Sequence, residues 1–474
     1  MHGKRGGIIL GLLLALYLAT AGYHMNRPLP SGLDTATPWR SVNNATFLAD
    51  HTWVDDTGER HSEQSIFDQQ LRLIEQAEQL VVLDEFLFNP FAGGIGAPYR
   101  PITEELTRAL IDRKKAVPEL RVVFITDPFN TLYGGVENPF IEQLQAAGIE
   151  VIFTDLDRLR DPNPAWSILW RACCQWAGNS RNGWLPSPVG TEAVTLRTYM
   201  ELLNFKANHR KTLVVDHGDS WAGVVTSANP HSASSAHDNV GLVFEGPAAL
   251  DLLQTEAAVA AFSHAKPVWP RAGDGVAGGL PRLRILTEAA IREAVLDTLN
   301  SARAGDEIDL LMFYLSHRGV LEALKRAHER GARVRVLLDP NKDAFGREKG
   351  GIPNRPVAHE LEDAGITVRW CDTHGEQCHA KMLLLRAEQG PARIILGSAN
   401  FTRRNLDNFN LETNVEVRAQ MGADLIRHAS RSFQSQWRNE NGRHHSVDYS
   451  VYADESIWKY ALYRFTEATG LSSF

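Results

Sequence analysis

The chain has 474 residues, of which 43% are hydrophobic and 22% are charged, so it can bury a packed core and is not a disordered protein. Its net charge of −8 argues against a general nucleic-acid-binding protein, because such proteins usually carry an excess of basic residues. Four cysteines are too few for a disulfide scaffold, and no Cys-x-x-Cys pair indicates a zinc site.

The N-terminal residues 1–25 combine two cations, Lys4 and Arg5, with an uncharged apolar segment that runs from Gly6 to Gly22. This segment is either a signal anchor that stays in the membrane or a signal peptide with a cleavage site at Ala19-Thr20-Ala21. In both cases the two cations stay on the cytoplasmic side. We therefore expect the rest of the chain to lie outside the cytoplasmic membrane.

The four cysteines form two pairs of near neighbours. Cys173 and Cys174 are adjacent, and a disulfide between adjacent residues is strained. Cys371 and Cys378 are separated by a short loop, so they either pair in an oxidising compartment or remain thiols near the core.

The same succession of helices and strands occurs twice along the chain. In both copies a β-branched apolar run ends in Asp-Pro, and a later strand follows an Ala-Gly helix stop. The matched segments are 80–88 with 308–315, 120–130 with 332–342, and 143–155 with 360–372. This alternation predicts an α/β fold in which helices cover the sheets.

The repeat predicts two domains. We expect the first at 45–266, a linker rich in proline and glycine at 267–281, and the second, with a C-terminal tail, at 282–474. The first copy also contains an insertion at 156–208 that carries four tryptophans. Two interpretations of the insertion stay open: a contact with lipid at a membrane surface, and a small aromatic core beneath a long loop.

Each copy of the repeat then presents one polar constellation. A histidine and a lysine two residues apart on a strand project to the same side, and the next short strand brings a serine and an asparagine alongside them. The first copy has His209, Lys211, Asp216, Ser227 and Asn229, and the second has His379, Lys381, Ser398 and Asn400.

These residue types suit the chemistry of a phosphodiester. One histidine attacks phosphorus and forms a covalent phosphohistidine, while the other protonates the leaving alkoxide and then deprotonates the acceptor. The lysines, serines and asparagines stabilise the negative oxygens. No metal or other cofactor is expected, since the lysines supply the positive charge.

The duplicated His-x-Lys pattern, with Asp216 in the first copy and Gly397-Ser398-Ala399-Asn400 in the second, resembles the phospholipase D superfamily. Within it the chain looks most like bacterial cardiolipin synthases and related membrane-tethered phospholipase D-like proteins. The resemblance implies two homologous α/β/α domains that form a pseudo-twofold pair with one active site between them, preceded by an N-terminal apolar helix. It also implies that His209 is the nucleophile and His379 the acid and base, although the sequence leaves the reverse assignment open.

The second copy departs from the pattern, because Arg386 stands where an aspartate is expected. Glu412 resembles the acidic residue that often follows the second motif and orients a histidine. Its counterpart in the first copy falls near Asn239, where no carboxylate is repeated. A degenerate, catalytically inactive protein therefore stays open as an alternative.

These observations predict an enzyme that acts on phospholipids, either by cardiolipin synthase-like transfer to an alcohol or by phospholipase D hydrolysis with water. An extracytoplasmic nuclease and a degenerate lipid-binding protein are the alternatives. We expect a phospholipid at the membrane surface as substrate, no nucleic acid and no obligate protein partner. The expected location is the bacterial cytoplasmic membrane, or the exported fraction, with the catalytic body facing the periplasm or exterior.

Overall fold

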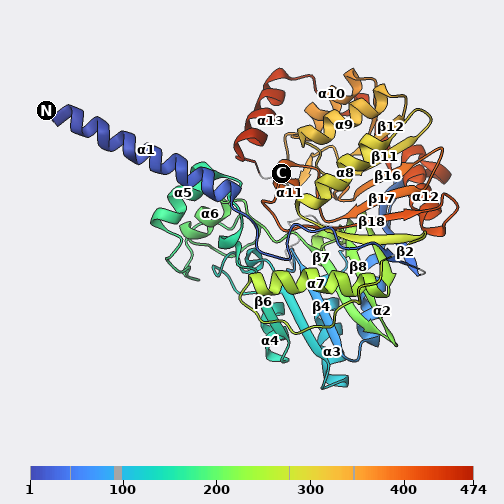
Figure 1. The fold of residues 1–474 in the computed structure, drawn as a ribbon, viewed down its shortest axis with the longest axis horizontal. Helices are drawn as coiled ribbons and strands as arrows, with labels where there is room; N and C mark the ends of the chain where they lie inside the picture. The colour runs from blue at the N-terminus through green and yellow to red at the C-terminus, as the bar shows by residue number, and fades with distance from the viewer. Residues whose placement is uncertain (1, 43, 90–98, 277, 345–346, 473) are drawn as a thin grey trace.

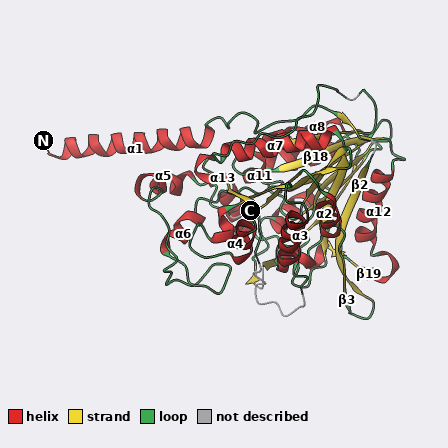
Figure 2. Cartoon of the chain, turned by 90° about the horizontal axis from the view of Figure 1, so that it is seen from below, coloured by secondary structure: helices red, strands yellow, loops and turns green. Residues whose placement is uncertain are grey.

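The computed structural model describes residues 2–42, 44–89, 99–276, 278–344, 347–472 and 474 and has a mixed α/β fold (Figures 1 and 2). The N-terminal helix α1 (His2–Asn26) projects from a body built on two large sheets. Its stretch Arg5–Asn26 is long and apolar enough to cross a membrane.

The first sheet has the strand order β19-β2-β9-β8-β7-β4-β5-β6, with β3 paired to β2. Its strands are β2 (Ala45–Asp55), β3 (Arg60–Glu63), β4 (Leu80–Glu85), β5 (Arg121–Thr126), β6 (Glu150–Phe153), β7 (Lys211–His217), β8 (Ser220–Thr226), β9 (Asn239–Glu245) and β19 (Arg443–His444). The helices of this half are α2 (Ile66–Gln76), α3 (Ile102–Ala116), α4 (Pro139–Ala146), α5 (Pro164–Cys173), α6 (Leu196–Leu202) and α7 (Pro247–Phe262).

The second sheet has the strand order β1-β10-β18-β17-β16-β11-β12-β15-β20. Its strands are β1 (Arg40–Ser41), β10 (Arg282–Thr287), β11 (Glu307–Met312), β12 (Arg333–Leu338), β15 (Thr367–Cys371), β16 (Lys381–Arg386), β17 (Ala392–Gly397), β18 (Thr413–Ala419) and β20 (Ser446–Asp448). The helices are α8 (Ala289–Ser301), α9 (Arg318–Glu329), α10 (Asn354–Asp363), α11 (Arg403–Leu406), α12 (Asp424–Arg438) and α13 (Ile457–Thr469), and a small ribbon joins β13 (Asp343–Ala344) to β14 (Arg347–Glu348).

The two sheets repeat one topology. The order β2-β9-β8-β7-β4-β5-β6 in the first matches β10-β18-β17-β16-β11-β12-β15 in the second. In both, three neighbouring strands are parallel, namely β4-β5-β6 and β11-β12-β15, and the remaining neighbours are antiparallel. The α/β class and the repeated architecture predicted from the sequence are therefore confirmed.

Short strands are exchanged between the two halves. β1 lies before the expected first domain but pairs with β10 of the second sheet, with Arg40 opposite Leu283. β19 comes from the C-terminal part of the chain but pairs with β2 of the first sheet, with Arg443 opposite Asp55. The boundaries 45–266, 267–281 and 282–474 stay predictions, and the paired strands cross them in both directions.

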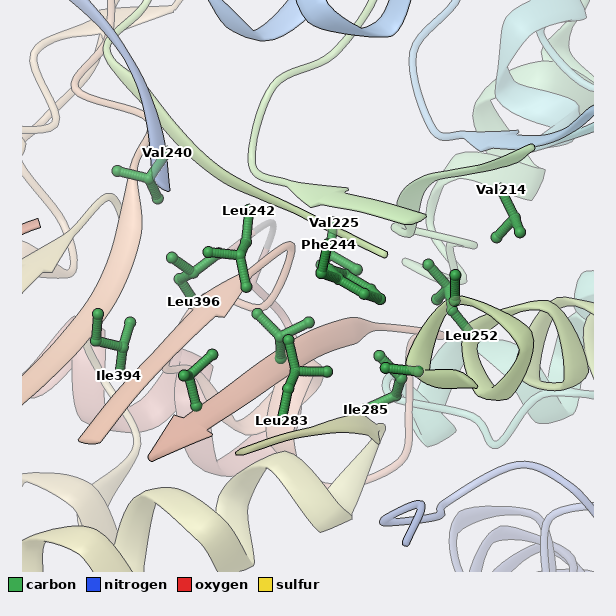
Figure 3. Close-up of a cluster of buried hydrophobic side chains, with 14 of the residues drawn as sticks. Val214, Val225, Val240, Leu242, Phe244, Leu252, Leu283, Ile285, Ile394 and Leu396 are labelled. Atoms are coloured by element: carbon green, nitrogen blue, oxygen red, sulfur yellow. The ribbon is translucent and has the colours of Figure 1, made fainter. Parts of the chain in front are cut away.

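A shared hydrophobic core holds the two sheets together (Figure 3). Leu242 and Phe244 of β9 pack in one buried cluster with Leu283 of β10, Ile394 and Leu396 of β17. Each of these five side chains is fully buried. Because this core contains side chains of both sheets, its packing fixes the position of one half relative to the other.

β4 and β11 end earlier than the sequence predicts, at residues 85 and 312 rather than at 88 and 315. Side-chain amides bond the backbone just beyond these points. Asn130 accepts a hydrogen bond from the Phe88 backbone N–H (2.8 Å) and donates one to the Phe86 carbonyl (2.8 Å). In the second half Asn354 donates to the Phe313 carbonyl (2.7 Å). Phe86 is thereby released from the ladder, whereas the Phe313 backbone N–H still donates to the Ala380 carbonyl (3.2 Å).

Both cysteine pairs form disulfides in the structure. One joins Cys173 to its neighbour Cys174 at the end of α5. The other joins Cys371, the last residue of β15, to Cys378, which immediately precedes His379. The second bond thus ties the end of one strand to the approach of another.

Replacing Phe244 by alanine should lower the free energy of unfolding by about 3–5 kcal/mol, because the cavity lies in the core shared by both sheets. The measurement is chemical denaturation of the full chain in detergent. The matched control is Val268→Ala, since Val268 is 84% exposed and its replacement should change stability by no more than about 0.5 kcal/mol. Equal losses in both variants would contradict the packing of Phe244 in a buried core.

Candidate active site

The two histidines of the repeated motif stand where the halves meet. The His209 backbone N–H donates to the carbonyl of Leu411 in the second half (2.9 Å). Reciprocally, the His379 backbone N–H donates to the carbonyl of Asp238 in the first half (2.9 Å). Both side chains line one cavity of about 260 Å³. The structure therefore brings together the two imidazoles that the sequence places 170 residues apart.

Each imidazole is oriented by a residue from the opposite half. The Nδ1 atom of His209 lies 2.9 Å from a carboxylate oxygen of Glu412. The Nδ1 atom of His379 lies 3.2 Å from the amide oxygen of Asn239. Since both Nδ1 atoms are engaged, the Nε2 atoms remain for chemistry. The site is thus symmetric in geometry but asymmetric in charge.

The two motif serines support these orienting residues. Ser398 is fully buried, and its hydroxyl donates to Glu412. Ser227 is also fully buried, and its hydroxyl donates to the amide oxygen of Asn239 (3.0 Å). The structure places both serines behind the histidine partners, so they act on the cavity through Glu412 and Asn239.

The motif lysines lie beneath the histidines. Lys211 Nζ donates to the carbonyl of His209 (2.7 Å), and Lys381 Nζ donates to that of His379. Each ammonium group also lies over an aromatic ring, at 5.2 Å from the Phe86 centroid and 5.0 Å from that of Phe313. Burial lowers the pKa of Lys211 to about 8 and that of Lys381 well below its usual value.

Burial also controls the protonation of the histidines. It lowers the pKa of His209 to about 4, although the charge of Glu412 opposes this shift. The pKa of His379 lies well below its usual value because of burial and the nearby charge of Lys381, and no carboxylate partner compensates. Both rings are therefore neutral near pH 7, which leaves the Nε2 lone pair of His209 free to act as a nucleophile.

The motif asparagines face the same cavity. Asn229 and Asn400 both line it and are 3% and 5% exposed. Within the described part of the chain, their side-chain oxygens have no hydrogen-bond partner. Two polar groups that are nearly buried and incompletely bonded at one cavity indicate a polar ligand there.

Asp216 and Arg386, the two residues at the matching end of the motif, lie away from the cavity. Asp216 accepts hydrogen bonds from the backbone N–H groups of residues 78, 79 and 80, which lead into β4. Arg386 forms ion pairs with Glu307 (2.7 Å) and Asp309 (2.6 Å) of β11. Both side chains attach their own strand to its neighbour, so Arg386 leaves the cavity unchanged.

Several residues of the site were not singled out by the sequence. Phe86 and Phe313 each contact a histidine, with ring centroids 4.9 Å apart in both halves. His237 also lines the cavity, 5.8 Å from the ring of His379, and burial lowers its pKa well below the usual value. No pattern in a single sequence separates such aromatic residues from ordinary core residues.

Two further buried aspartates, one in each half, bond the residue that precedes the motif histidine. Asp127 accepts from the Asn208 backbone N–H (2.7 Å), and Asp339 accepts from that of Cys378 (2.8 Å). Burial raises the pKa of Asp127 to about 7 and that of Asp339 to about 6. Both belong to the Asp-Pro pairs that end the repeated apolar runs of the sequence, and that pattern alone does not indicate their contact with the motif.

A buried ion pair crosses the interface next to His209. Arg210 and Glu288 are fully buried and lie 2.7 Å apart, and the same Glu288 oxygen accepts from the Glu412 backbone N–H (3.1 Å). Although burial disfavours charge, Glu288 and Glu256 raise the pKa of Arg210 above its usual value. Glu288 has a φ of +50°, a conformation rarely adopted outside glycine and typical of constrained sites. This pair fixes Glu412 relative to His209.

The tryptophan-bearing insertion combines buried and exposed rings. Trp170 is buried and lies under the guanidinium of Arg197, whereas Trp176 and Trp184 are 79% and 73% exposed. The segment that follows α6 contributes Phe205 to the cavity wall. The insertion therefore has an internal aromatic contact and also presents aromatic rings to its surroundings.

The sequence and the fold are similar to known proteins. Residues 295–437 match the family model described as cardiolipin synthase, PLD-like domain. No curated protein gives a significant match. Among solved structures, phosphatidylserine synthase from Haemophilus influenzae Rd KW20 is similar in fold, with a TM-score of 0.58 and 12% identity over 95% of this chain and 97% of that chain.

Two other solved structures are less similar. Polyphosphate kinase from Porphyromonas gingivalis has a TM-score of 0.47 and 13% identity over 90% of this chain and 53% of that chain. The phospholipase D family member Nuc from Salmonella typhimurium has a TM-score of 0.28 and 20% identity over 35% of this chain and 97% of that chain. Neither value is high enough to carry an argument.

The matched region contains the second motif, with His379, Lys381 and Glu412. The first motif has the same place in the matching sheet, and the fold similarity extends over both halves. This domain type indicates phosphodiester chemistry. Residues 295–437 of this chain therefore carry a phospholipase D-like domain.

Proposed function

We propose that the protein is a phosphatidyltransferase or phospholipase D that acts on phospholipids through a phosphohistidine intermediate. The observation that carries the proposal is the pair of neutral imidazoles, His209 and His379, on one cavity between the halves. Their different partners, Glu412 and Asn239, suggest different roles for the two rings.

In the first step His209 is the nucleophile. Its Nε2 atom attacks the phosphorus of the lipid, so that an N–P bond forms while the P–O bond to the head group breaks. Glu412 holds Nδ1–H and stabilises the positive charge that the ring acquires. His379, protonated when the anionic phosphodiester is bound, gives its proton to the leaving alkoxide.

In the second step the proton moves in the opposite direction. His379 takes the proton of an acceptor hydroxyl, whose oxygen attacks phosphorus while the bond to His209 Nε2 breaks. An alcohol acceptor gives phosphatidyl transfer, and water gives hydrolysis to phosphatidic acid. With phosphatidylglycerol as donor and acceptor, the products are cardiolipin and glycerol.

The phosphodiester oxygens are stabilised by the groups around the cavity. Lys211 and Lys381 place two amino groups beneath the histidines, and the negative charge of a bound phosphodiester favours their protonated form. Asn229 and Asn400 offer side-chain amides from the cavity wall. Such preorganised charge favours a transition state that carries negative oxygens. The proposed steps therefore require no metal and no organic cofactor.

The α1 helix supports a substrate in the membrane. We propose that it is a retained anchor and that the body lies on the periplasmic or outer side, since the cations Lys4 and Arg5 precede the apolar stretch. The two disulfides favour an oxidising compartment. These features favour a lipid over a nucleic acid, and the place of Arg386, away from the cavity, removes the main support for a degenerate site.

The covalent intermediate can be trapped with a phosphatidyl substrate whose head group is p-nitrophenol, because this group leaves without protonation. His379→Asn should form the phosphatidyl adduct and retain it, with turnover lowered by about 10²–10⁴-fold. His209→Asn should form none. Intact-protein mass spectrometry after rapid quenching measures both, and an adduct that persists in His209→Asn would contradict the assigned nucleophile.

The acceptor can be identified with vesicles of phosphatidylglycerol alone. We expect cardiolipin and glycerol as products, detected by lipid mass spectrometry, and no cleavage of plasmid DNA by the same preparation. Phosphatidic acid without cardiolipin would assign water as the acceptor. Cleavage of DNA that is lost in His209→Asn would instead establish the nuclease.

The pH profile of kcat/KM should distinguish the two histidines. Its acid limb should lie near pH 4, where His209 gains a proton and ceases to be a nucleophile. Glu412→Gln removes a charge that raises the pKa of His209, so this limb should move to lower pH. Asn239→Asp adds a carboxylate beside His379, which must be protonated, so the basic limb should move to higher pH.

The two substitutions control for each other because they occupy matching places in the two halves. If Asn239→Asp displaced the acid limb and Glu412→Gln the basic limb, the roles of His209 and His379 would be reversed.

A further inference from the structure

The C-terminal helix α13 exposes an apolar face. Ile457, Trp458, Leu462 and Phe465 are 74%, 82%, 52% and 57% exposed. Their spacing places them on one side of the helix. Four large apolar side chains gathered on one helix are unusual on the surface of a soluble protein and mark a contact surface.

The opposite side of α13 is bonded to the body of the second half. The Tyr463 hydroxyl donates to the carbonyl of Ser316 (2.9 Å), and both Tyr463 and Glu467 are buried. Glu467 accepts from the Ser316 hydroxyl (2.9 Å) and from the Arg403 backbone N–H (2.9 Å). The apolar face is therefore held outward by specific bonds.

A second group of exposed apolar side chains lies on the insertion. Leu169, Trp176, Trp184 and Leu196 are 52%, 79%, 73% and 55% exposed. The insertion adjoins the end of α13, because a Cβ atom added at Gly470 would lie only 1.7 Å from the Pro162 carbonyl oxygen. The two apolar groups thus belong to neighbouring parts of the surface.

The base of α1 packs on the same insertion. The Tyr17 hydroxyl donates to the Ala165 carbonyl (2.7 Å), and the Asp161 backbone N–H donates to the His24 carbonyl (3.1 Å). Figures 1 and 2 show α5, α6 and α13 on the side of the body from which α1 projects. A bilayer crossed by α1 would therefore lie beside these elements.

We propose that the exposed apolar residues of α13 and of the insertion form a second membrane contact, which lies on the lipid surface around α1. We call it the lipid-facing surface, and it consists of Leu169, Trp176, Trp184, Leu196, Ile457, Trp458, Leu462 and Phe465. Tryptophan favours the membrane interface, where its amphipathic ring lies at the level of the head groups.

The charges of α13 fit an anionic lipid surface. Lys459 and Arg464 are its two cations, of which Lys459 also pairs with Asp454, and its single carboxylate, Glu467, is buried against the protein. An amphipathic helix with cations beside an apolar face binds the head-group region of an anionic bilayer. The lipid contact is independent of the proposed chemistry. If that chemistry holds, the contact also places the cavity near its lipid substrate. Phe205, which belongs to the insertion, lines the cavity. Arg404 lines it too and donates to the Ser472 carbonyl just beyond α13 (3.4 Å).

The test uses the full chain in vesicles of phosphatidylcholine with an equal amount of phosphatidylglycerol. Because the four cysteines are all disulfide-bonded, a cysteine introduced at an exposed position can be labelled selectively with a nitroxide. The test variants are Trp458→Cys and Leu462→Cys. The matched control is Arg431→Cys on α12, an exposed helical position at the end of the body away from α1 (Figure 1).

Electron paramagnetic resonance then compares relaxation by oxygen, which concentrates in lipid, with relaxation by a water-soluble nickel complex. The oxygen-to-nickel ratio should be several-fold higher at 458 and 462 than at 431. Equal ratios at the three positions would overturn the proposal. Dipolar broadening between labels at 462 on neighbouring molecules would overturn it in favour of a second copy of the chain. Failure here would leave the adduct experiment unaffected, so the two proposals are tested separately.

Discussion

Two backbone hydrogen bonds across the interface determine whether this site exists. The N–H of His209 is bonded to Leu411, and the N–H of His379 to Asp238, so each histidine is positioned by the half to which it does not belong. The hydrophobic core shared by the two sheets keeps these bonds in register. A cavity lined by both histidines therefore depends on the packing of two sheets, and damage to the core far from the cavity would separate the groups that react.

The repeated architecture gives the two halves of the site the same geometry. A difference between the halves at one matching position gives the two histidines different chemistry. Glu412 and Asn239 occupy matching positions, since each directly follows the residue whose carbonyl accepts the backbone N–H of a histidine from the other half. They contact Nδ1 of their histidines at similar distances, 2.9 and 3.2 Å. Only the carboxylate can stabilise a positively charged ring. In this account the choice of nucleophile is thus made by one residue of the opposite half, while the lysines beneath both rings provide a field common to the two steps.

The sequence predicted the repeat and the motif residues because both have strong local patterns: apolar strands that end in Asp-Pro, and His-x-Lys before an apolar run. It could not place Asp216 or Arg386, since their distance from the cavity depends on which end of the strand faces the other half. The contacts of Phe86 with His209 and Lys211 arise because β4 ends just before Phe86. The side-chain amide of Asn130, far along the sequence, bonds the Phe86 carbonyl in place of a strand partner. The exchanged strands β1 and β19 have two residues each, too few for any periodicity to show.

In the proposed reaction one phosphorus atom is held between the Nε2 atoms of His209 and His379. A structure of the full chain with vanadate, which mimics a phosphoryl group in transfer, measures this most directly. We expect vanadium bonded to His209 Nε2, with an apical oxygen within hydrogen-bond distance of His379 Nε2. Vanadate bound outside the cavity, or bonded to neither imidazole, would contradict it.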